Sequence, residues 1–532
     1  MAKHQRPIFL ILFLLPCFFI RAQTPTKMES EYERYVRQQQ ASFNRFAERR
    51  QQEMDSLRQA ANKAFNAMLN KDWKEAESKK ISSPYPRPKP VEPPRAEKKE
   101  QRDTLLLEQT KKQKESGLAP NKNREKDNRL SAEEPKPKKD APVSAEPALD
   151  DFPEPKPEPR QNEERLDELS AFPELGLEKV QTFGWDWYMP SVTPGFEAPQ
   201  GPINDKTIAA AYAKWIGSNQ EQLLGYFKAS QKKFNLNDWA LLLLIRKLSA
   251  KLGYNPAQAA VFEWFYLTQL GYDAILMYSD REVYAGLCFA EKVYGRFLEK
   301  DGKRYLMPED APAKPYYTYQ NQNSYATRPI EFKNLGAVQV NSGGKERLFS
   351  FQVLGNAYKL PLSYNLGRVQ LYASLPQSDI PFYLSNRAAE PWLSEANHQK
   401  IARELSRFSK PMDKLRFLHA LVLQGIPYQT DQEQFGKEKF CLTEETLDYP
   451  FADCEDRSFL LNRLIQTFTT WKTIGVRFPN HLALAVALEP EPGMEVLKHK
   501  GRQWVYCDPT YFGADVGRIP VQYKTVAWQA VE

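Results

Sequence analysis

The chain has 532 residues, of which 41% are hydrophobic and 27% are charged, so it is long enough for two or three folded domains. Its net charge of +7 comes from 74 basic and 67 acidic residues that largely balance one another. This balance does not indicate nucleic-acid binding, and a lysine run such as Lys136–Lys139 lies in a polar stretch where solvated charge is the ordinary interpretation. We therefore expect no nucleic-acid partner.

The first residues have the pattern of a secretory signal. A basic start up to Arg6 precedes the apolar run Ile8–Ile20, and Ala22 ends a small-residue cleavage site. The run is shorter than the ~20 residues of a membrane-spanning helix, which favours a cleaved signal peptide at 1–22 over an uncleaved signal anchor. Cys17 is followed by further apolar residues, unlike a lipid-attachment cysteine, so we interpret it as part of the signal. From the signal pattern as a whole, we expect an exported protein.

The next segments predict a long helix and then a linker. Large side chains recur at nearly helical spacing between Tyr32 and Trp73, which predicts an amphipathic helix over residues 28–80. Such a helix is either solvent-exposed with a narrow apolar stripe, or a coiled-coil-like element for self-association or cell-envelope attachment. Residues 81–180 are rich in Pro, Lys and Glu, so we expect a disordered linker there.

The remaining chain predicts three folded parts. Helical patterns begin a domain at 181–325, and helical patterns return in a domain at 393–532. Between them, short runs bounded by turn residues predict a β-rich, sandwich-like domain at 326–392. The strands expected in that domain are Leu348–Val353, Tyr358–Tyr364, Val369–Ala373 and Pro381–Leu384.

Cys454 lies at the expected start of a largely buried helix. Asp453 precedes it and an apolar stripe follows it as far as Phe468. The unpaired amides and dipole of a helix start favour negative charge, so the pKa of a thiol there is expected to fall. Because a reactive Cys454 stays free, the sequence leaves open which other mature cysteines, if any, are paired: Cys288, Cys441 and Cys507.

Two further residues complete a candidate triad. His481 lies between the strand-like runs Thr473–Phe478 and Leu482–Leu488, and Asp508 follows a third run at Gln503–Cys507. Adjacent antiparallel strands would set the imidazole beside the thiol and the carboxylate behind the imidazole. We therefore expect Cys454, His481 and Asp508 to form a catalytic triad.

Taken singly, each residue has an ordinary structural interpretation, as a core cysteine, a strand histidine or a turn aspartate. A zinc site built from Cys454, His481, Asp508 and Cys507 is a rival, but the sequence contains no close ligand pair of the Cys-x-x-Cys kind. We expect neither a metal nor a cofactor. An oxyanion hole would use the Cys454 amide and a second donor, for which Gln434 is the candidate.

In order and spacing, these motifs resemble the transglutaminase-like superfamily, whose papain-related domain packs a Cys-bearing helix on a sheet carrying His and Asp. The resemblance covers about the last quarter of the chain, and more narrowly it is to exported members from Bacteroidota. It implies a protein or peptide-like amide substrate and a periplasmic or envelope-associated location. One departure is Leu482-Ala483, where many relatives have Ala-Trp after the His. The motifs are Asp453-Cys454-Glu455-Asp456, Gly475–Phe478 with Asn480-His481, Trp504–Thr510, Asp431–Gly436 and Tyr449–Cys454.

Residues 181–325 have the layout of a second, degenerate transglutaminase-like unit. Pro256, Tyr284 and Pro308 fall near the positions of the Cys, His and Asp, so we expect this copy to be inert. The alternative is an unrelated helical domain.

The sequence thus predicts an α+β protein with a C-terminal transglutaminase-like domain. The leading hypothesis is an exported cysteine peptidase or amidase that forms an acyl-enzyme on Cys454, with His481 as base and then acid. Hydrolysis is favoured over acyl transfer, because water is always available in an open site. The alternative is a non-enzymatic cell-envelope assembly or binding protein that uses the same fold.

Overall fold

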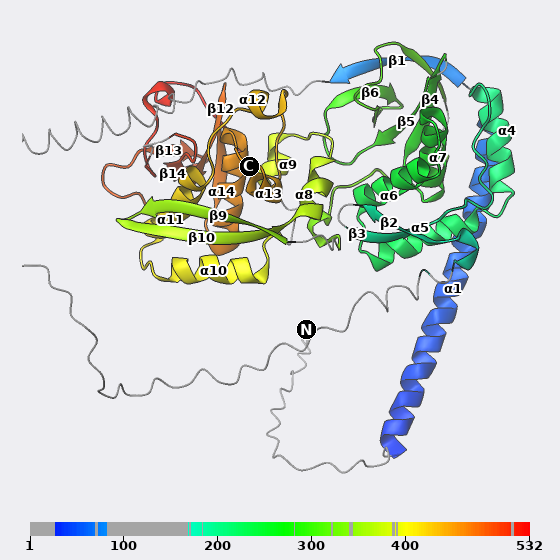
Figure 1. Cartoon of the computed structure of the whole chain (residues 1–532), viewed down its shortest axis with the longest axis horizontal. Helices are drawn as coiled ribbons and strands as arrows, with labels where there is room; N and C mark the ends of the chain where they lie inside the picture. Colours follow the sequence, from blue (N-terminus) through cyan, green and yellow to red (C-terminus); the bar gives the residue numbers. More distant parts are fainter. Residues whose placement is uncertain are drawn as a thin grey trace, which may run out of the picture. The chain divides into compact units, whose positions relative to one another are not determined.

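A computed structural model of the chain describes residues 27–69, 73–81, 169, 172–182, 185–280, 282–320, 323–339, 344–385, 389, 392–511 and 515–532. The expected signal peptide, and the expected linker apart from Ile81 and a few residues at its C-terminal end, lie outside the described residues. The chain divides into two compact units, 1–62 and 63–532. Among the described helices, none is long and apolar enough to cross a membrane. Helices and strands are mixed throughout (Figure 1), which confirms the α+β class.

The first unit contains most of one long helix, α1 (Lys27–Leu69), as far as Asn62. Met54 and Leu57 are 45% and 63% exposed on it, in agreement with the predicted stripe. The prediction is wrong beyond Leu69, because Trp73–Ile81 form strand β1 instead of further helix. Pairing with two other strands decides this segment, and a local helical pattern cannot compete with it.

Strand β1 closes a barrel whose other strands come from much later in the chain. The strand order is β1-β6-β7-β5-β4-β8, with β1 antiparallel to both β6 and β8. Phe65 packs inside this part, with its ring centroid 5.5 Å from that of Tyr212 and 5.1 Å from that of Tyr319. The strands are β4 (Ala274–Ser279), β5 (Glu282–Cys288), β6 (Gly295–Lys300), β7 (Lys303–Leu306) and β8 (Pro315–Tyr319).

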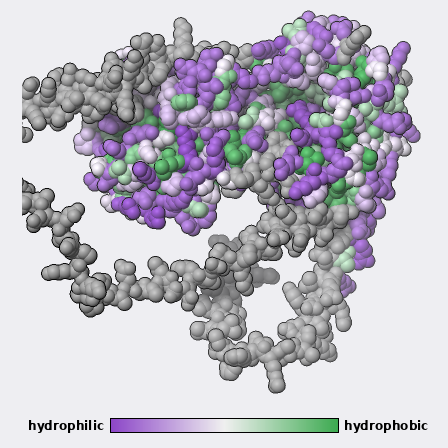
Figure 2. All heavy atoms as spheres, in the orientation of Figure 1, coloured by the Kyte–Doolittle hydropathy of each residue, from purple (hydrophilic) through white to green (hydrophobic). Residues whose placement is uncertain are grey.

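A small hairpin and several helices precede β4 in the chain. Helix α7 packs against β4, β5 and α6. Hydrophilic side chains dominate the face seen in Figure 2, and hydrophobic ones appear in smaller patches between them. The elements are β2 (Glu178–Thr182), β3 (Trp185–Met189), α4 (Asp205–Ile216), α5 (Glu221–Lys233), α6 (Asp238–Lys251) and α7 (Pro256–Gln269), with short 3₁₀ turns at Pro173–Leu175 and Leu335–Ala337.

The expected β-rich domain at 326–392 is a single hairpin followed by two short helices. The hairpin packs against α11 of the C-terminal part, and the Phe351 and Phe417 rings lie 5.1 Å apart, so it is not a domain of its own. The predicted strand at Val369–Ala373 is helical because Asn365 caps a helix, accepting hydrogen bonds from the amides of Gly367 and Arg368. The elements are β9 (Gly344–Val353), β10 (Asn356–Asn365), α8 (Leu366–Ala373) and α9 (Ile380–Ser385).

The C-terminal part carries a sheet of order β13-β14-β12-β11-β15, on which α14 packs. The strand predicted at Thr473–Phe478 is confirmed residue for residue. The elements are α10 (Glu395–Ser406), α11 (Pro411–Gly425), α12 (Asp431–Phe435), α13 (Thr443–Asp448), α14 (Cys454–Phe468), β11 (Thr473–Phe478), β12 (His481–Val486), β13 (Val496–His499), β14 (Arg502–Cys507), a 3₁₀ turn at Val521–Tyr523 and β15 (Gln529–Val531).

The two sheets repeat one topology. The order β6-β7-β5-β4-β8 in the barrel matches β13-β14-β12-β11-β15, and α7 precedes β4 as α14 precedes β11. Pro256 opens α7 as Cys454 opens α14, in agreement with the predicted repeat.

The register of the strands corrects the other two matches between the copies. Glu282, and not Tyr284, starts β5 as His481 starts β12, because Ser279 pairs with Glu282 as Phe478 pairs with His481. Leu306 pairs with Leu287, and Val505 pairs with Val486 at the matching position of the other sheet. Counting three residues on from each therefore aligns Glu309, and not Pro308, with Asp508.

We predict that a chain cleaved at a protease site engineered between residues 82 and 168 keeps its N-terminal fragment under native conditions, because β1 pairs with β6 and β8. Size-exclusion chromatography would show the two fragments eluting together in native buffer and separately in urea. Ala76→Pro removes an amide from a strand paired on both sides and is expected to release the fragment, whereas Ala76→Val is not. Release of the N-terminal fragment from the cleaved chain with Ala76 unchanged would contradict the structural role of β1.

Candidate functional site

Cys454 is the first residue of α14, as the sequence predicts. The Asp453 side chain caps the helix by accepting a hydrogen bond from the Asp456 amide at 3.1 Å. The cysteine is only 5% exposed, and the helix behind it is buried along most of its length. The thiol is therefore held at a fixed point in the interior.

The start of α14 is tied to the start of β12. The Ser458 hydroxyl, one helical turn after Cys454, donates a hydrogen bond to the Leu482 carbonyl at 2.9 Å. Because Leu482 follows His481 directly, this contact sets the thiol and the imidazole on neighbouring elements.

His481 and Asp508 form a buried pair. Their Nε2 and Oδ2 atoms lie 2.7 Å apart, which leaves the Nδ1 atom of His481 for another partner. The Tyr506 hydroxyl and the Thr510 amide also donate to the Asp508 carboxylate, each at 2.9 Å. Burial alone would raise the pKa of Asp508, but the charge of His481 and these hydrogen bonds hold it below its usual range.

Aromatic rings fix the plane of the imidazole. The Tyr523 ring stacks on His481 at 5.0 Å and an interplanar angle of 11°, and the Tyr511 ring meets His481 edge-on at 5.2 Å. The two tyrosine hydroxyls are 3.0 Å apart. This packing leaves the imidazole little freedom to rotate.

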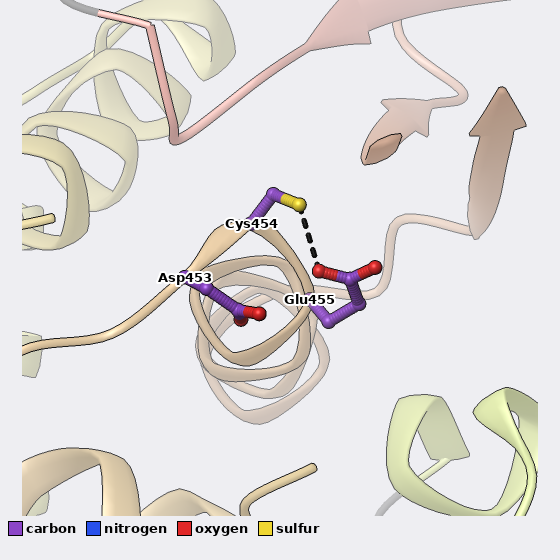
Figure 3. A group of neighbouring side chains, drawn as sticks. All are labelled: Asp453, Cys454 and Glu455. Carbon is purple, nitrogen blue, oxygen red and sulfur yellow. Dashed lines mark hydrogen bonds between the residues drawn. The ribbon is translucent and has the colours of Figure 1, made fainter. Parts of the chain in front are cut away.

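The thiol itself is engaged with a carboxylate. Cys454 donates a hydrogen bond from Sγ to Oε2 of Glu455 at 2.7 Å, and Figure 3 shows the thiol pointing toward that group. No hydrogen bond between Cys454 and His481 occurs among the described residues. Burial, followed by the carboxylates of Glu455 and Asp453, raises the pKa of the Cys454 thiol well above its usual range. The expected lowering of this pKa is therefore wrong, because burial and two acidic neighbours outweigh the helix start.

Further buried carboxylates surround the same helix start. The Lys439 amide donates to Asp431 at 2.7 Å, and the Cys441 amide donates to Asp456 at 2.8 Å. Burial raises the pKa of Asp431, Asp453 and Asp456. The neighbourhood of the thiol therefore favours neutral groups.

Two sets of side chains in the described chain bring their ligand atoms within 4.8 Å of one another: Asp453 with Cys454 and Glu455, and Asp431 with Glu438 and Asp453. Both sets belong to the acidic surroundings of the helix start, and hydrogen bonds inside the protein already use Asp431, Asp453 and Glu455. Within that part of the chain, no such set joins Cys454 to His481 and Asp508, so the geometry does not favour the rival zinc site.

Two residues that hold the segment around Asp508 in place were not among the predicted site residues. The His419 ring lies 2.6 Å from the Asp508 carbonyl oxygen through Nε2, and Arg457 donates to the Pro509 carbonyl at 3.0 Å. Burial lowers the pKa of His419, which keeps its ring neutral. A charged residue inside an apolar helix, as Arg457 is, was the one available clue.

The remaining expected residues have different outcomes. Gln434 lies on α12, and its Oε1 atom is buried without a hydrogen-bond partner. The structure records no contact that makes it an oxyanion donor, so this role stays a prediction. The cysteines that the structure describes are all free, which answers the open question of pairing: Cys288, Cys441, Cys454 and Cys507.

Comparison with known proteins finds no matching family model, no matching curated protein and no matching solved structure. The interpretation of the site therefore depends on its own residues. The His481–Asp508 pair is formed, and the thiol lies on the adjoining element.

We predict that Glu455→Gln speeds alkylation of Cys454 by iodoacetamide at pH 8 by about tenfold, because removing one nearby carboxylate lowers a thiol pKa by about one unit. Peptide mass spectrometry would follow each cysteine separately. Burial and the charge of Asp273 raise the pKa of the more exposed Cys288 to about 11, so it serves as an internal reference. Glu489→Gln, at an exposed position, is the matched control. An unchanged Cys454 rate would show that Glu455 does not restrain the thiol.

We also predict that Asp431→Asn stabilises the protein at pH 8 but not at pH 4. A carboxyl whose pKa is higher in the folded chain than in the unfolded chain weakens the fold as pH rises above the ordinary aspartate value. The thermal midpoint at pH 8 is expected to rise by about 2 °C, and the exposed Asp310→Asn variant supplies the control. An equal shift at both pH values would contradict this assignment.

Proposed function

We propose that this protein is an exported, transglutaminase-like cysteine enzyme that cleaves amide bonds through an acyl-enzyme on Cys454. The observation that carries the proposal is the buried His481–Asp508 pair at 2.7 Å, in which His481 starts β12, the strand that contacts the helix beginning at Cys454, and Asp508 directly follows β14. A carboxylate that binds one nitrogen of an imidazole fixes its tautomer and stabilises its positive charge.

The chemistry follows from this arrangement. His481 takes the thiol proton at Nδ1, and the sulfur attacks the carbonyl carbon of the amide, forming the S–C bond. The imidazolium then gives its proton to the leaving nitrogen as the C–N bond breaks. A water molecule, deprotonated by the same imidazole, attacks the thioester, releases the carboxylic acid and restores the thiol. Asp508 holds the ring in place during both halves of the reaction.

Glu455 sets the resting state in this proposal. The thiol first has to leave its hydrogen bond to Glu455 and turn to His481, so the free enzyme keeps a protonated cysteine. Substrate binding would supply the energy for this change. We propose hydrolysis as the default reaction, and an amine in place of water would give acyl transfer through the same intermediate.

One observation favours the alternative, a non-enzymatic envelope assembly or binding protein. The raised pKa of Cys454 and its hydrogen bond to a carboxylate describe a thiol that is not activated. In either case, we propose that the N-terminal copy, with Pro256, Glu282 and Glu309 at the matching positions, braces or binds without chemistry. The N-terminal helix would serve envelope attachment.

Trapping the intermediate tests the proposal. The full chain is incubated with a mixed peptide library, quenched in acid and digested, and a thioester adduct is expected on the Cys454 peptide alone. His481→Ala and Asp508→Asn are expected to lower adduct formation by about 10³-fold or more, the size of the loss when a serine-protease triad loses its His or Asp. Lys206→Gln, exposed on α4, is the control. Turnover that survives Cys454→Ala would contradict the role of Cys454 as nucleophile, whereas the absence of both adduct and turnover would favour the binding protein.

A further inference from the structure

The β9–β10 hairpin has two edges, and α11 covers a part of the first. The Gln424 side-chain amide accepts from the Gln352 amide and donates to the Gln352 carbonyl, both at 2.9 Å. The backbone groups of Gln352 therefore point away from β10. This side-chain amide takes the place of one residue of a neighbouring strand.

The second edge, along β10, is covered in the same way at one end only. The Asn397 amide accepts from the Ser363 amide at 3.1 Å and donates to the Ser363 carbonyl at 2.5 Å. Lys400 donates to the Pro361 carbonyl at 2.9 Å, and proline has no amide hydrogen. Helix α10, which lies beside β10 in Figure 1, thus satisfies the edge from Pro361 to Ser363.

The alternation of an antiparallel pair shows which residues come next on this edge. Gln352 lies opposite Ala357, so Ala357 also directs its backbone groups away from its partner strand, as do Lys359, Pro361 and Ser363. No backbone or side-chain hydrogen bond to the amide or carbonyl of Ala357 or Lys359 occurs on this edge among the described residues. Both residues are exposed, so a short stretch of strand edge is open.

A basic groove follows this open edge. It has a volume of about 370 Å³, and its walls are residues 356–361 of β10 and one face of α10. Four basic side chains line it against one carboxylate, Glu404, and the Arg403 and Arg407 side chains are 73% and 62% exposed. The basic residues are Lys359, Lys400, Arg403 and Arg407.

We propose that this groove binds an extended acidic peptide segment, which adds to β10 as a third strand. Strand addition uses the free amide and carbonyl groups of Ala357 and Lys359, and it gives affinity through main-chain hydrogen bonds. The basic rim selects acidic side chains at alternate positions, because every second residue of the added strand faces the same way. The groove holds no nucleophile of the Cys454 site, so its occupant is a partner and not the proposed substrate.

A binding measurement tests the proposal with the full chain carrying Cys454→Ser, which removes turnover. The probe is a short fluorescein-labelled peptide in which glutamate alternates with valine, followed by fluorescence anisotropy. Replacing the glutamates with glutamine, or N-methylating the central amides so that they cannot donate, is expected to weaken binding by about tenfold or more. The double variant Arg403→Gln, Arg407→Gln is expected to weaken binding of the glutamate peptide to a similar extent.

Two controls keep the test independent of folding defects. Lys206→Gln removes one exposed positive charge elsewhere and is expected to leave binding unchanged. Because the N-methylated peptide probes unaltered protein, its result cannot arise from misfolding. Equal affinity for the N-methylated peptide would overturn strand addition, and equal affinity for the glutamine peptide would overturn acidic selectivity. Binding of a polyuronate polysaccharide with no binding of the peptide would overturn both.

Discussion

The contact between the start of α14 and the start of β12 is the constraint on which the site depends. Cys454 and Ser458 lie one helical turn apart on one face of α14, and the Ser458 hydroxyl donates a hydrogen bond to the Leu482 carbonyl. Cys454 and His481 thereby begin two elements that pack against each other, although the two residues are far apart in the chain. His419, Tyr506 and the Thr510 amide then hold Asp508 behind the imidazole.

Burial raises the pKa at both ends of this site, but the neighbouring groups give the two residues net shifts of opposite sign. At Asp508, the charge of His481 and donated hydrogen bonds outweigh the cost of burial, so the pKa falls and the carboxylate stays ionised. At Cys454, the nearest groups are carboxylates, which add to the cost of burial and keep the thiol neutral. The resting site therefore combines an oriented imidazole with an unactivated nucleophile, and Glu455 is the residue that separates the resting state from the proposed active one.

The two copies of the topology differ in how they treat the edge strands of the sheet, whose outer backbone groups have no neighbouring strand. In the barrel, β1 lies between β6 and β8, so no strand edge is left open. A strand at residues 73–81 thus completes a barrel whose other strands begin only at residue 274. In the C-terminal sheet, β13 and β15 remain at the two ends of the strand order. The β9–β10 hairpin uses a third device, in which the side-chain amides of Gln424 and Asn397 stand in for neighbouring strands.

The sequence by itself determined the elements whose pattern is local: the helix that begins at Cys454, the strand Thr473–Phe478, and the pairing partners His481 and Asp508. Hydrophobic periodicity and an N-capping aspartate are sufficient for the helix and the strand, whereas His481 and Asp508 were predicted from the order and spacing of the three motifs. Only the tertiary structure decided that Trp73–Ile81 form a barrel strand and that the Cys454 pKa rises. Each of these depends on groups distant in the chain, because strand pairing, helix packing and burial are properties of neighbours in space that no local pattern specifies.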